Sequence, residues 1–328
     1  MEKLLQKRVS MARLPTPVDF FGRLSEKYRM KLFIKRDDLT ESIASGNKLR
    51  KMEYVLFDAM EKGADTLVTC GGIQSNHCRA VAWVAASRGL HCLLLLRGQA
   101  PQIPQGNLLL DRILGAEVRY YTPEDFKNIN TIADDVCGEL LLKGRRPYYI
   151  PMGASTATGS LGYVNMIGEL AAQGNSYDHI YCATGSGGTL AGILLGCRFF
   201  NFPGTLHGMA VCDDTAYFVS ELERICGEFK EKYGIDADFS NAAKVIDDRY
   251  VGTGYALNTP AELRTMAAIA QTEGLVLDPV YSLKAFIGMI DHVRQGIIQP
   301  DETVLFIHTG GHSGIFAKND EFKEFGRR

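Results

Sequence analysis

The chain has 328 residues, more than a single hydrophobic core usually accommodates, so two domains are expected. Hydrophobic residues make up 46% of the chain and charged residues 23%, a balance typical of soluble globular proteins. The formal net charge of -2, without any long basic run, excludes the charge pattern of a nucleic-acid or membrane-surface protein and favours a small substrate.

Predicted strands and helices alternate from Leu32 almost to the end of the chain, which favours parallel sheets covered by helices. The early series is strand 32–35, helix 47–62, strand 66–69, helix 75–87, strand 92–96, helix 105–114, strand 118–121, helix 123–142 and strand 148–150. The later series is helix 157–173, strand 179–184, helix 188–200, strand 206–211, helix 216–232, helices 260–273 and 282–295, and strand 303–308. The pattern predicts an α/β fold.

Glycines cluster directly after several predicted strands, at Gly71-Gly72, Gly153, Gly185 to Gly188 and Gly310-Gly311. Open parallel sheets bind ligands outside the carboxyl ends of their strands. We therefore expect these loops to share one crevice.

No apolar stretch reaches the length of a membrane span, since the most hydrophobic piece, Cys92 to Leu96, is only as long as a strand. Residues 1–5 lack the long apolar core and the small-residue cleavage site of a secretory signal. We therefore expect a cytoplasmic protein without membrane or nucleic-acid partners.

The eight cysteines are spread through apolar segments without a CxxC pair, which favours reduced core thiols over a disulfide framework or a zinc site. His308 and His312 form one tempting pair of metal ligands. Gly310 and Gly311 lie between them and predict a loop instead of one helical face, so no metal is expected.

Lys48 lies in a glycine turn at the start of a predicted amphipathic helix, for which Asn47 is the expected N-cap. The positive end of the helix dipole disfavours a cation in this first turn. The position therefore favours a lysine that is neutral or bound covalently to a carbonyl cofactor. The alternative is an ordinary solvated lysine in a charged turn.

The segment Gly185-Ser186-Gly187-Gly188-Thr189 follows an apolar strand and opens a helix, so its N–H groups can surround a phosphate. It lacks the third glycine of a dinucleotide fingerprint, because Leu190 stands there, and it lacks the Lys-Ser/Thr pair of a Walker A loop. A small phosphate ester fits it better. A tight turn without a ligand is the alternative.

The segment Gln74-Ser75-Asn76-His77 also joins a strand to a helix and combines hydroxyl, amide and imidazole groups with first-turn N–H donors. Such a cluster can hold a carboxylate. The alternative is that Ser75 or Asn76 only caps the helix.

Tyr255 and Tyr281 each lie beside turn residues, where a hydroxyl can face a pocket, and Thr309 ends an apolar strand with a neutral hydroxyl. Each of the three can equally be an ordinary packed or strand-end residue.

Together, a lysine at a helix start, a phosphate loop, a carboxylate-binding turn and a strand-end threonine describe a pyridoxal 5'-phosphate pocket. The chain resembles the fold type II (tryptophan synthase β-like) pyridoxal phosphate enzymes, and within them the D-cysteine desulfhydrase and aminocyclopropane-carboxylate (ACC) deaminase family, especially its desulfhydrases. The matching segments run in order along the chain: residues 14–17, 34–40, 46–51, 74–77, 185–189, 277–281 and 306–311.

This resemblance implies a fold of two open twisted parallel-sheet domains, each with helices on both faces, with the cofactor between them. The large domain comprises residues 1–45 and 159–328, and the small domain residues 46–158. The resemblance also implies a symmetric homodimer.

The resemblance also implies roles for individual residues. Lys48 matches the Schiff-base lysine, and the other cofactor-binding positions are Asn47, Asn76 at the 3-hydroxyl, Gly185, Ser186, Gly187, Gly188 and Thr189 at the phosphate, and Thr309 at the pyridine nitrogen. The substrate-binding positions are Gln74, Ser75, Asn76 and His77, and the catalytic positions are Lys48, Ser75, Tyr255 and Tyr281.

Three departures from the family pattern stand out. ACC deaminases carry a glutamate after the second tyrosine that pairs with the pyridine nitrogen, whereas this chain has Ser282. Ser45 and Ala256 replace glycines that many relatives carry. The resemblance implies that Ser45 leaves the lysine assignment intact but can alter the local turn, and that Ala256 can reshape the substrate pocket.

The resemblance implies β-elimination on a small amino acid, with D-cysteine giving pyruvate, ammonia and hydrogen sulfide, because a threonine partner makes the cofactor a weaker electron sink than opening a cyclopropane needs. Alternatives within the family are an ACC deaminase, an L-cysteate sulfo-lyase or another sulfur or hydroxyl eliminase. From a different class, the chain can be a cofactor-binding carrier or regulator with degenerate catalysis.

Overall fold

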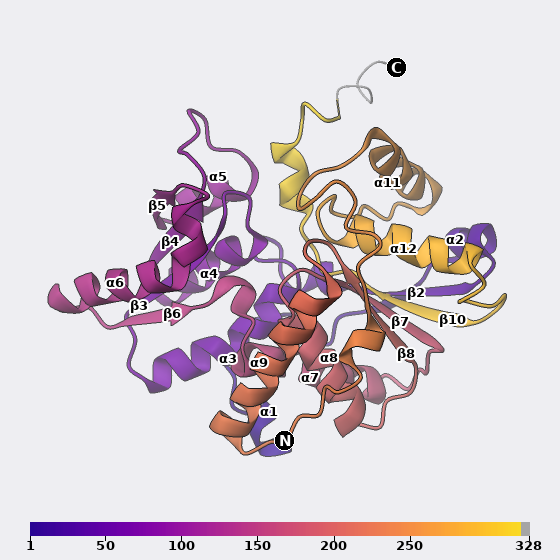
Figure 1. Cartoon of the computed structure of the whole chain (residues 1–328), viewed down its shortest axis with the longest axis horizontal. Coiled ribbons are helices and arrows are strands. Elements are labelled where there is room, and N and C mark those ends of the chain that lie inside the picture. The colour runs from indigo at the N-terminus through magenta and orange to yellow at the C-terminus, as the bar shows by residue number, and fades with distance from the viewer. Residues whose placement is uncertain (323–328) are drawn as a thin grey trace.

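The computed structural model describes residues 1–322 of the chain, and residues 323–328 lie outside the described part. Two lobes, each built on one sheet, lie side by side (Figure 1). The larger sheet has the strand order β1-β2-β10-β7-β8-β9, and only β1 runs antiparallel to its neighbour. Its strands are β1 (Val18–Phe20), β2 (Lys31–Lys35), β7 (His179–Thr184), β8 (Thr205–Ala210), β9 (Ile246–Asp247) and β10 (Thr303–Ile307).

The smaller sheet is wholly parallel, with the order β5-β4-β3-β6. Its strands are β3 (Thr66–Gly72), β4 (His91–Arg97), β5 (Glu117–Tyr121) and β6 (Pro147–Ile150). Its helices are α3 (Asn47–Glu61), α4 (Asn76–Arg88), α5 (Gly106–Ile113) and α6 (Ile129–Leu142).

The other helices belong with the larger sheet or connect the lobes. They are α1 (Glu2–Leu5), α2 (Gly22–Tyr28), α7 (Ala157–Ala172), α8 (Gly188–Phe199), α9 (Thr215–Tyr233), α10 (Ala242–Val245), α11 (Pro260–Glu273) and α12 (Ser282–Arg294). Short 3-10 turns are η1 (Asp37–Leu39), η2 (Asp125–Asn128), η3 (Met152–Ala154) and η4 (His312–Ala317).

Both sheets are covered on both faces, as the alternation of side chains along the central strands shows. In β7, Ile180 and Cys182 belong to one hydrophobic core, whereas Tyr181 and Ala183 belong to the core on the opposite face. In β4, Leu94 and Leu93 likewise point into different cores. The α/β prediction with helices on both faces is confirmed.

The order of the predicted elements is confirmed, with differences at short or irregular ones. The predicted helix 123–142 is wrong in its first part, where η2 precedes α6. β1 and α2 were not predicted. β1 is a three-residue edge strand, which is too short to show an alternation of apolar and polar residues.

The domain division remains a proposal. The strands β3 to β6 all lie within residues 46–158, and the strands of the larger sheet lie outside that range. The proposed boundary at residue 158 falls in the first turn of α7, which packs directly against α3.

Within residues 1–322, no helix combines the length and the apolarity that crossing a membrane requires. The eight cysteines have free thiols, and the four that are buried are Cys70, Cys78, Cys92 and Cys182.

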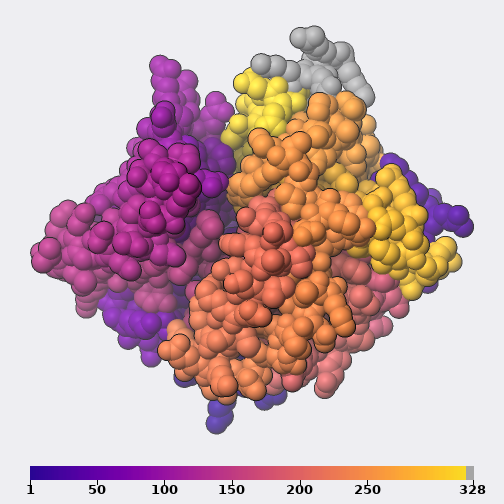
Figure 2. Space-filling model, viewed as in Figure 1, coloured from indigo at the N-terminus to yellow at the C-terminus, as the bar shows by residue number. Residues whose placement is uncertain are grey.

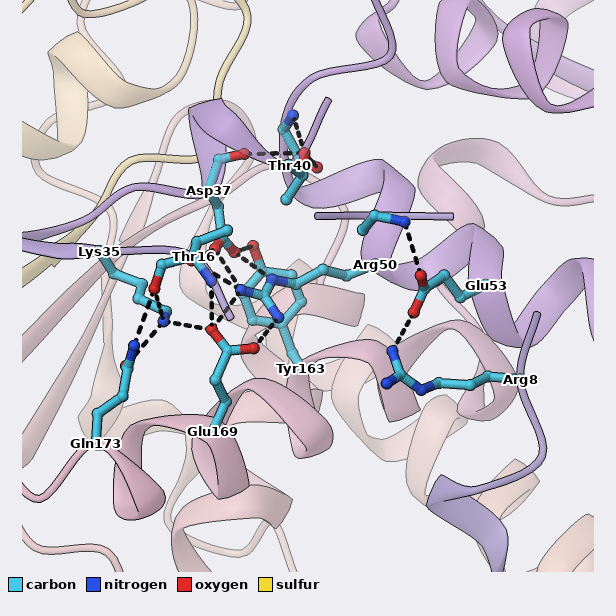
Figure 3. Close-up of polar contacts among 12 residues, drawn as sticks. Arg8, Thr16, Lys35, Asp37, Thr40, Arg50, Glu53, Tyr163, Glu169 and Gln173 are labelled. Atoms are coloured by element: carbon cyan, nitrogen blue, oxygen red, sulfur yellow. Dashed lines mark hydrogen bonds and ion pairs between the residues drawn. The ribbon is translucent and has the colours of Figure 1, made fainter. Parts of the chain in front are cut away.

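A buried network of ion pairs and hydrogen bonds links helix α3 to the larger lobe (Figure 3). Arg50 of α3 is almost completely buried and donates to Asp37 Oδ1 at 2.7 Å and to Glu169 Oε2 at 2.9 Å. Glu169 also accepts from Lys35, and Asp37 accepts from the Tyr163 hydroxyl at 2.6 Å. Because α3 also carries Lys48, this network holds the start of that helix against the larger sheet.

Candidate active site

A cavity of about 500 Å³ lies between the two lobes, at the carboxyl ends of β3, β7 and β10. Gly72 at the end of β3, and Gly185 and Thr309 from the loops after β7 and β10, contribute to its wall. In the space-filling view a hollow separates the magenta surface of the smaller lobe from the orange surface of the larger one (Figure 2). The expected shared crevice is present, as the geometry of open parallel sheets predicts.

Most of the predicted site residues line this cavity. They are Asn47, Lys48, Ser75, Asn76, His77, Gly185, Ser186, Gly187, Thr189, Tyr255, Tyr281 and Thr309. Gln74 and Gly188 do not line it. The Gln74 side chain instead donates to the Gln105 carbonyl and accepts from the Asn107 N–H, which directs it toward α5.

Lys48 is the second residue of α3 and points into the cavity wall formed by η3, where its Nζ lies 3.3 Å from the Gly153 carbonyl oxygen. Burial lowers the pKa of Lys48 to about 8, because the charged amine loses its hydration there. At pH 7 roughly a tenth of this lysine is therefore the neutral, nucleophilic amine, far more than for an exposed lysine. The expectation of a lysine with suppressed charge agrees with this geometry.

The expected N-cap at Asn47 is wrong, because the helix cap is Gly46 and Asn47 is the first helical residue. Gly46 has φ 114°, and a Cβ at this position would lie 2.4 Å from the Thr309 carbonyl oxygen, so only glycine fits. The N–H of Asn47 donates to that carbonyl, and its Nδ2 donates to Thr189 Oγ1. Asn47 thereby ties the lysine turn to both neighbouring loops.

The lowered pKa of Lys48 predicts how apoprotein takes up a carbonyl cofactor. Only the neutral amine attacks an aldehyde, so the attachment rate should rise about tenfold per pH unit and level off above about pH 8. An exposed lysine would continue to rise toward about pH 10. Following the visible absorbance after mixing apoprotein with pyridoxal 5'-phosphate measures the rate, and a continued rise through pH 9 would contradict a buried Lys48.

The glycine-rich loop turns from β7 directly into α8, with Gly187 as the helix cap at φ 76°. Ser155 holds the loop through two hydrogen bonds, since its Oγ donates to Ser186 Oγ at 2.9 Å and accepts from the Gly188 N–H at 3.3 Å. A Cβ on Gly185 would lie 2.8 Å from the Tyr281 ring, so glycine allows the ring to pack on the loop. The loop thus presents helix-start N–H groups to the cavity.

Lys51 lies behind this loop and was not predicted as a site residue. Its side chain is fully buried, its Nζ donates to the Gly153 carbonyl at 3.0 Å, and it lies 2.9 Å from the place that a Cβ of Gly188 would take. Burial and the neighbouring Lys48 lower its pKa well below the usual value. Its position three residues after Lys48, on the same helix face, was the signal that could have found it. A phosphate dianion bound in the loop would give the Lys51 amine an anionic partner.

The turn predicted to bind a carboxylate, Gln74 to His77, lies at the start of α4. Ser75 is the N-cap and its Oγ accepts from the Cys78 N–H, so it caps the helix and lines the cavity at once. His77 is neutral, because burial lowers its pKa well below the usual value. Thr69 Oγ1 donates to the Ile150 carbonyl and must therefore accept from His77 Nε2, which leaves His77 Nδ1 as a bare acceptor.

The two tyrosines meet at the cavity, with their hydroxyl oxygens 2.5 Å apart. Burial raises the pKa of both hydroxyls, and for Tyr281 it raises the pKa well above the usual value. Both hydroxyls therefore keep their protons at neutral pH and can act as hydrogen-bond donors.

Thr309 and Ser282 have different surroundings. Thr309 lines the cavity, whereas Ser282 is buried at the start of α12 and its Oγ donates to Asp278 Oδ1 at 2.6 Å. The hydroxyl of Ser282 is thus engaged within its own turn.

The fold brings His308 and His312 together with Asp38, although the two glycines between the histidines predicted only a loop. Possible ligand atoms of all three lie within 4.8 Å of one another. Both imidazole Nε2 atoms lie within hydrogen-bond distance of the Val276 carbonyl, and Arg36 donates to both carboxylate oxygens of Asp38. Each group thus has a protein partner, and we assign no metal here.

The cavity fits pyridoxal 5'-phosphate. It combines a buried amine of lowered pKa with a glycine loop at a helix start, which suit the aldehyde and the phosphate of that cofactor. The buried Oγ1 of Thr184 and Nδ1 of His77 also lack protein partners within residues 1–322, and both residues line the cavity. The fold and the site together define a pyridoxal phosphate-dependent enzyme of fold type II.

Comparison with known proteins agrees. The family model described as "Pyridoxal-phosphate dependent enzyme" matches residues 9–310. A Thermotoga maritima protein provisionally named 1-aminocyclopropane-1-carboxylate deaminase is 44% identical, over 95% of this chain and 98% of its own. A D-cysteine desulfhydrase of Serratia proteamaculans is 37% identical, over 96% and 97%. The crystal structure of an "ACC deaminase homologue" has a TM-score of 0.90 at 38% identity, covering 98% of both chains.

The chain therefore belongs to the pyridoxal phosphate-dependent enzymes, within the family of ACC deaminases and D-cysteine desulfhydrases. Its cofactor is pyridoxal 5'-phosphate, and it is a lyase of small amino acids.

Proposed function

We propose that this enzyme eliminates the β-substituent of a small amino acid, and that D-cysteine is the substrate, giving pyruvate, ammonia and hydrogen sulfide. The observation that carries this choice is Ser282, which stands where ACC deaminases have a glutamate and bonds to Asp278. The cavity wall then offers Thr309 to the pyridine nitrogen, as in the desulfhydrases.

Bound pyridoxal 5'-phosphate stabilises the electron pair left at the substrate α-carbon once the proton is removed. A carboxylate beside the pyridine nitrogen strengthens this effect by keeping the nitrogen protonated, and a threonine hydroxyl does not. A thiolate leaves more readily than a ring carbon. The threonine site therefore favours elimination of sulfide over opening of a cyclopropane.

In this proposal Lys48 removes the α-proton. Its lowered pKa, near 8, makes the neutral amine available at working pH, and a positioned base typically contributes on the order of a hundred- to ten-thousandfold in rate. Ser75, together with the first-turn N–H groups of α4, holds the substrate carboxylate. The Nδ1 of His77, which has no protein partner within residues 1–322, is free to accept a hydrogen bond from the substrate on the same side of the cavity.

The tyrosine pair supplies protons. Both hydroxyls are protonated at neutral pH, and their 2.5 Å contact lets one donate to the departing sulfur while it accepts from the other. We propose that Tyr281, the more deeply buried, acts with Tyr255 as a unit.

ACC deamination is the second candidate. The names of the Thermotoga relative and of the solved homologue favour it. L-cysteate sulfo-lyase activity needs the same residues with a different leaving group. A carrier or regulator without catalysis would need the phosphate loop but not a buried amine of lowered pKa beside two tyrosines.

A side-by-side assay of D-cysteine, β-chloro-D-alanine, L-cysteate, L-serine and aminocyclopropane carboxylate tests the proposal. We expect kcat/KM for D-cysteine to exceed that for the cyclopropane substrate at least about tenfold. A difference of about 1.4 kcal/mol between the activation free energies of the two reactions is enough for this ratio. Sulfide and pyruvate are measured against 2-oxobutyrate and sulfite. Predominant 2-oxobutyrate would refute the role assigned to Ser282, and no turnover of any of the five would favour the carrier.

The family resemblance extends the proposal to a symmetric homodimer in the cytoplasm. Sedimentation of the holoenzyme and fractionation of cells that express it measure these two properties.

A further inference from the structure

Arg79 of α4 is a fully buried arginine without an ion pair among residues 1–322. Its Nη1 donates to Asn107 Oδ1 at 2.6 Å and to Asn76 Oδ1 at 3.2 Å, and its Nη2 donates to the Ser45 carbonyl at 2.9 Å. All three acceptors are neutral oxygens, and the Nε of Arg79 has no partner in this part of the chain. Burying a charge in this way is costly, so such an arginine is rare without a functional reason.

The acidic groups around Arg79 leave its charge uncompensated. Asp111 of α5 has no hydrogen-bond partner within the described residues, and burial raises its pKa to about 8, so it is mainly protonated at neutral pH. Asp278 accepts from the N–H groups of Tyr281 and Ser282, and Glu41 accepts from that of Ala44. These three carboxyl groups are the ones that act on Arg79, and none forms an ion pair with it.

The Asn76 amide has only one orientation that suits this network. Its oxygen accepts from Arg79 and from Asn107 Nδ2 at 2.9 Å, so its NH2 group turns the other way. That nitrogen lies 2.9 Å from the place that a Cβ of Gly311 would take, beside the loop that carries Thr309. Asn107 is held in turn, because its Nδ2 also donates to the Gln74 carbonyl.

We propose that Arg79 is a positioning residue: with Asn107 it directs the Asn76 NH2 group at the cofactor, and its unpaired charge stabilises an anionic oxygen bound there. This rests on the proposed site, in which Asn76 meets the 3-oxygen of pyridoxal 5'-phosphate. Gln74, which does not line the cavity, then serves the site by holding Asn107. Lys48 and Lys51 of α3 face the same site, and burial lowers the pKa of each.

The test compares Arg79→Gln, Arg79→Lys and the parent holoenzyme by visible absorption across the pH range in which each stays folded. The measured quantity is the midpoint, the pH at which the visible band of the bound cofactor is half converted. A nearby positive charge disfavours every protonation of the cofactor, so Arg79→Gln should raise this midpoint by about one pH unit. Arg79→Lys keeps the charge and should titrate close to the parent. Arg88→Gln, at the exposed end of the same helix, is the matched control and should leave the midpoint unchanged.

A second variant alters the surroundings of the Arg79 charge by changing its hydrogen-bond partner Asn107. Asn107→Asp places a carboxylate against Arg79 and should also raise the midpoint, even if Arg79→Gln does not fold. A midpoint that stays at the parent value in Arg79→Gln and Asn107→Asp, or that shifts equally in Arg79→Lys and Arg79→Gln, overturns the proposal. A parent protein without a visible cofactor band would instead refute the proposed function.

Discussion

Lys48→Ala should abolish turnover, with kcat reduced at least about a thousandfold, and should remove the covalent link to the cofactor. Two losses combine in this variant: the amine that attacks the aldehyde and the base that moves the α-proton, the latter worth on the order of a hundred- to ten-thousandfold alone. Lys48 is the amine on the cavity wall whose burial lowers its pKa to about 8. Sulfide release and reduction of the link with borohydride measure the two effects separately.

The control for this variant is Lys62→Ala at the exposed end of the same helix, where Lys62 pairs with Asp58. It should retain full activity and the covalent link. Retained thermal stability of Lys48→Ala would show that the loss is chemical. If Lys48→Ala still releases sulfide at the parent rate, another group is the base, and the assignment of Lys48 fails.

Arg50→Met should lower the free energy of unfolding by about 3–5 kcal/mol, because removing one partner leaves buried negative charges uncompensated. Arg50 bonds to Asp37 and Glu169, and among residues 1–322 only Glu169 keeps a second ion-pair partner, Lys35. Within the same described residues, the Asp37 carboxylate would retain only hydroxyl donors from Thr16 and Tyr163. Chemical denaturation of the apoprotein measures the change without the contribution of bound cofactor.

Lys62→Met is the matched control for charge removal on the same helix. Lys62 is 59% exposed, and its partner Asp58 keeps a second ion pair with Lys232, so the expected change is within about 1 kcal/mol. A change in Arg50→Met no larger than in Lys62→Met would contradict the stabilising role of the network. Because Arg50 and Lys48 share α3, Arg50→Met should also weaken cofactor retention in the holoenzyme.

Residue patterns along the chain were sufficient to predict the elements and the chemistry that depend on near neighbours. Apolar runs predicted β7 and α11 with their observed bounds, because such patterns follow from the local repeat of strand and helix. The glycine loop at 185–188 and the lysine turn at 46–48 were recognisable for the same reason, since a phosphate-binding turn and its helix are contiguous.

Contacts between residues far apart in the chain became visible only in the folded protein. Gly46 displaced Asn47 as helix cap because Thr309, more than 250 residues later, packs against it. The burial of Lys51 behind the glycine loop at 185–188 likewise arises only when the two lobes meet, and Arg79 acquires its partner Asn107 only when α5 packs against α4. Periodicity records which face of an element is buried, but not which distant polar group meets it there, so these partners could not be read from the sequence.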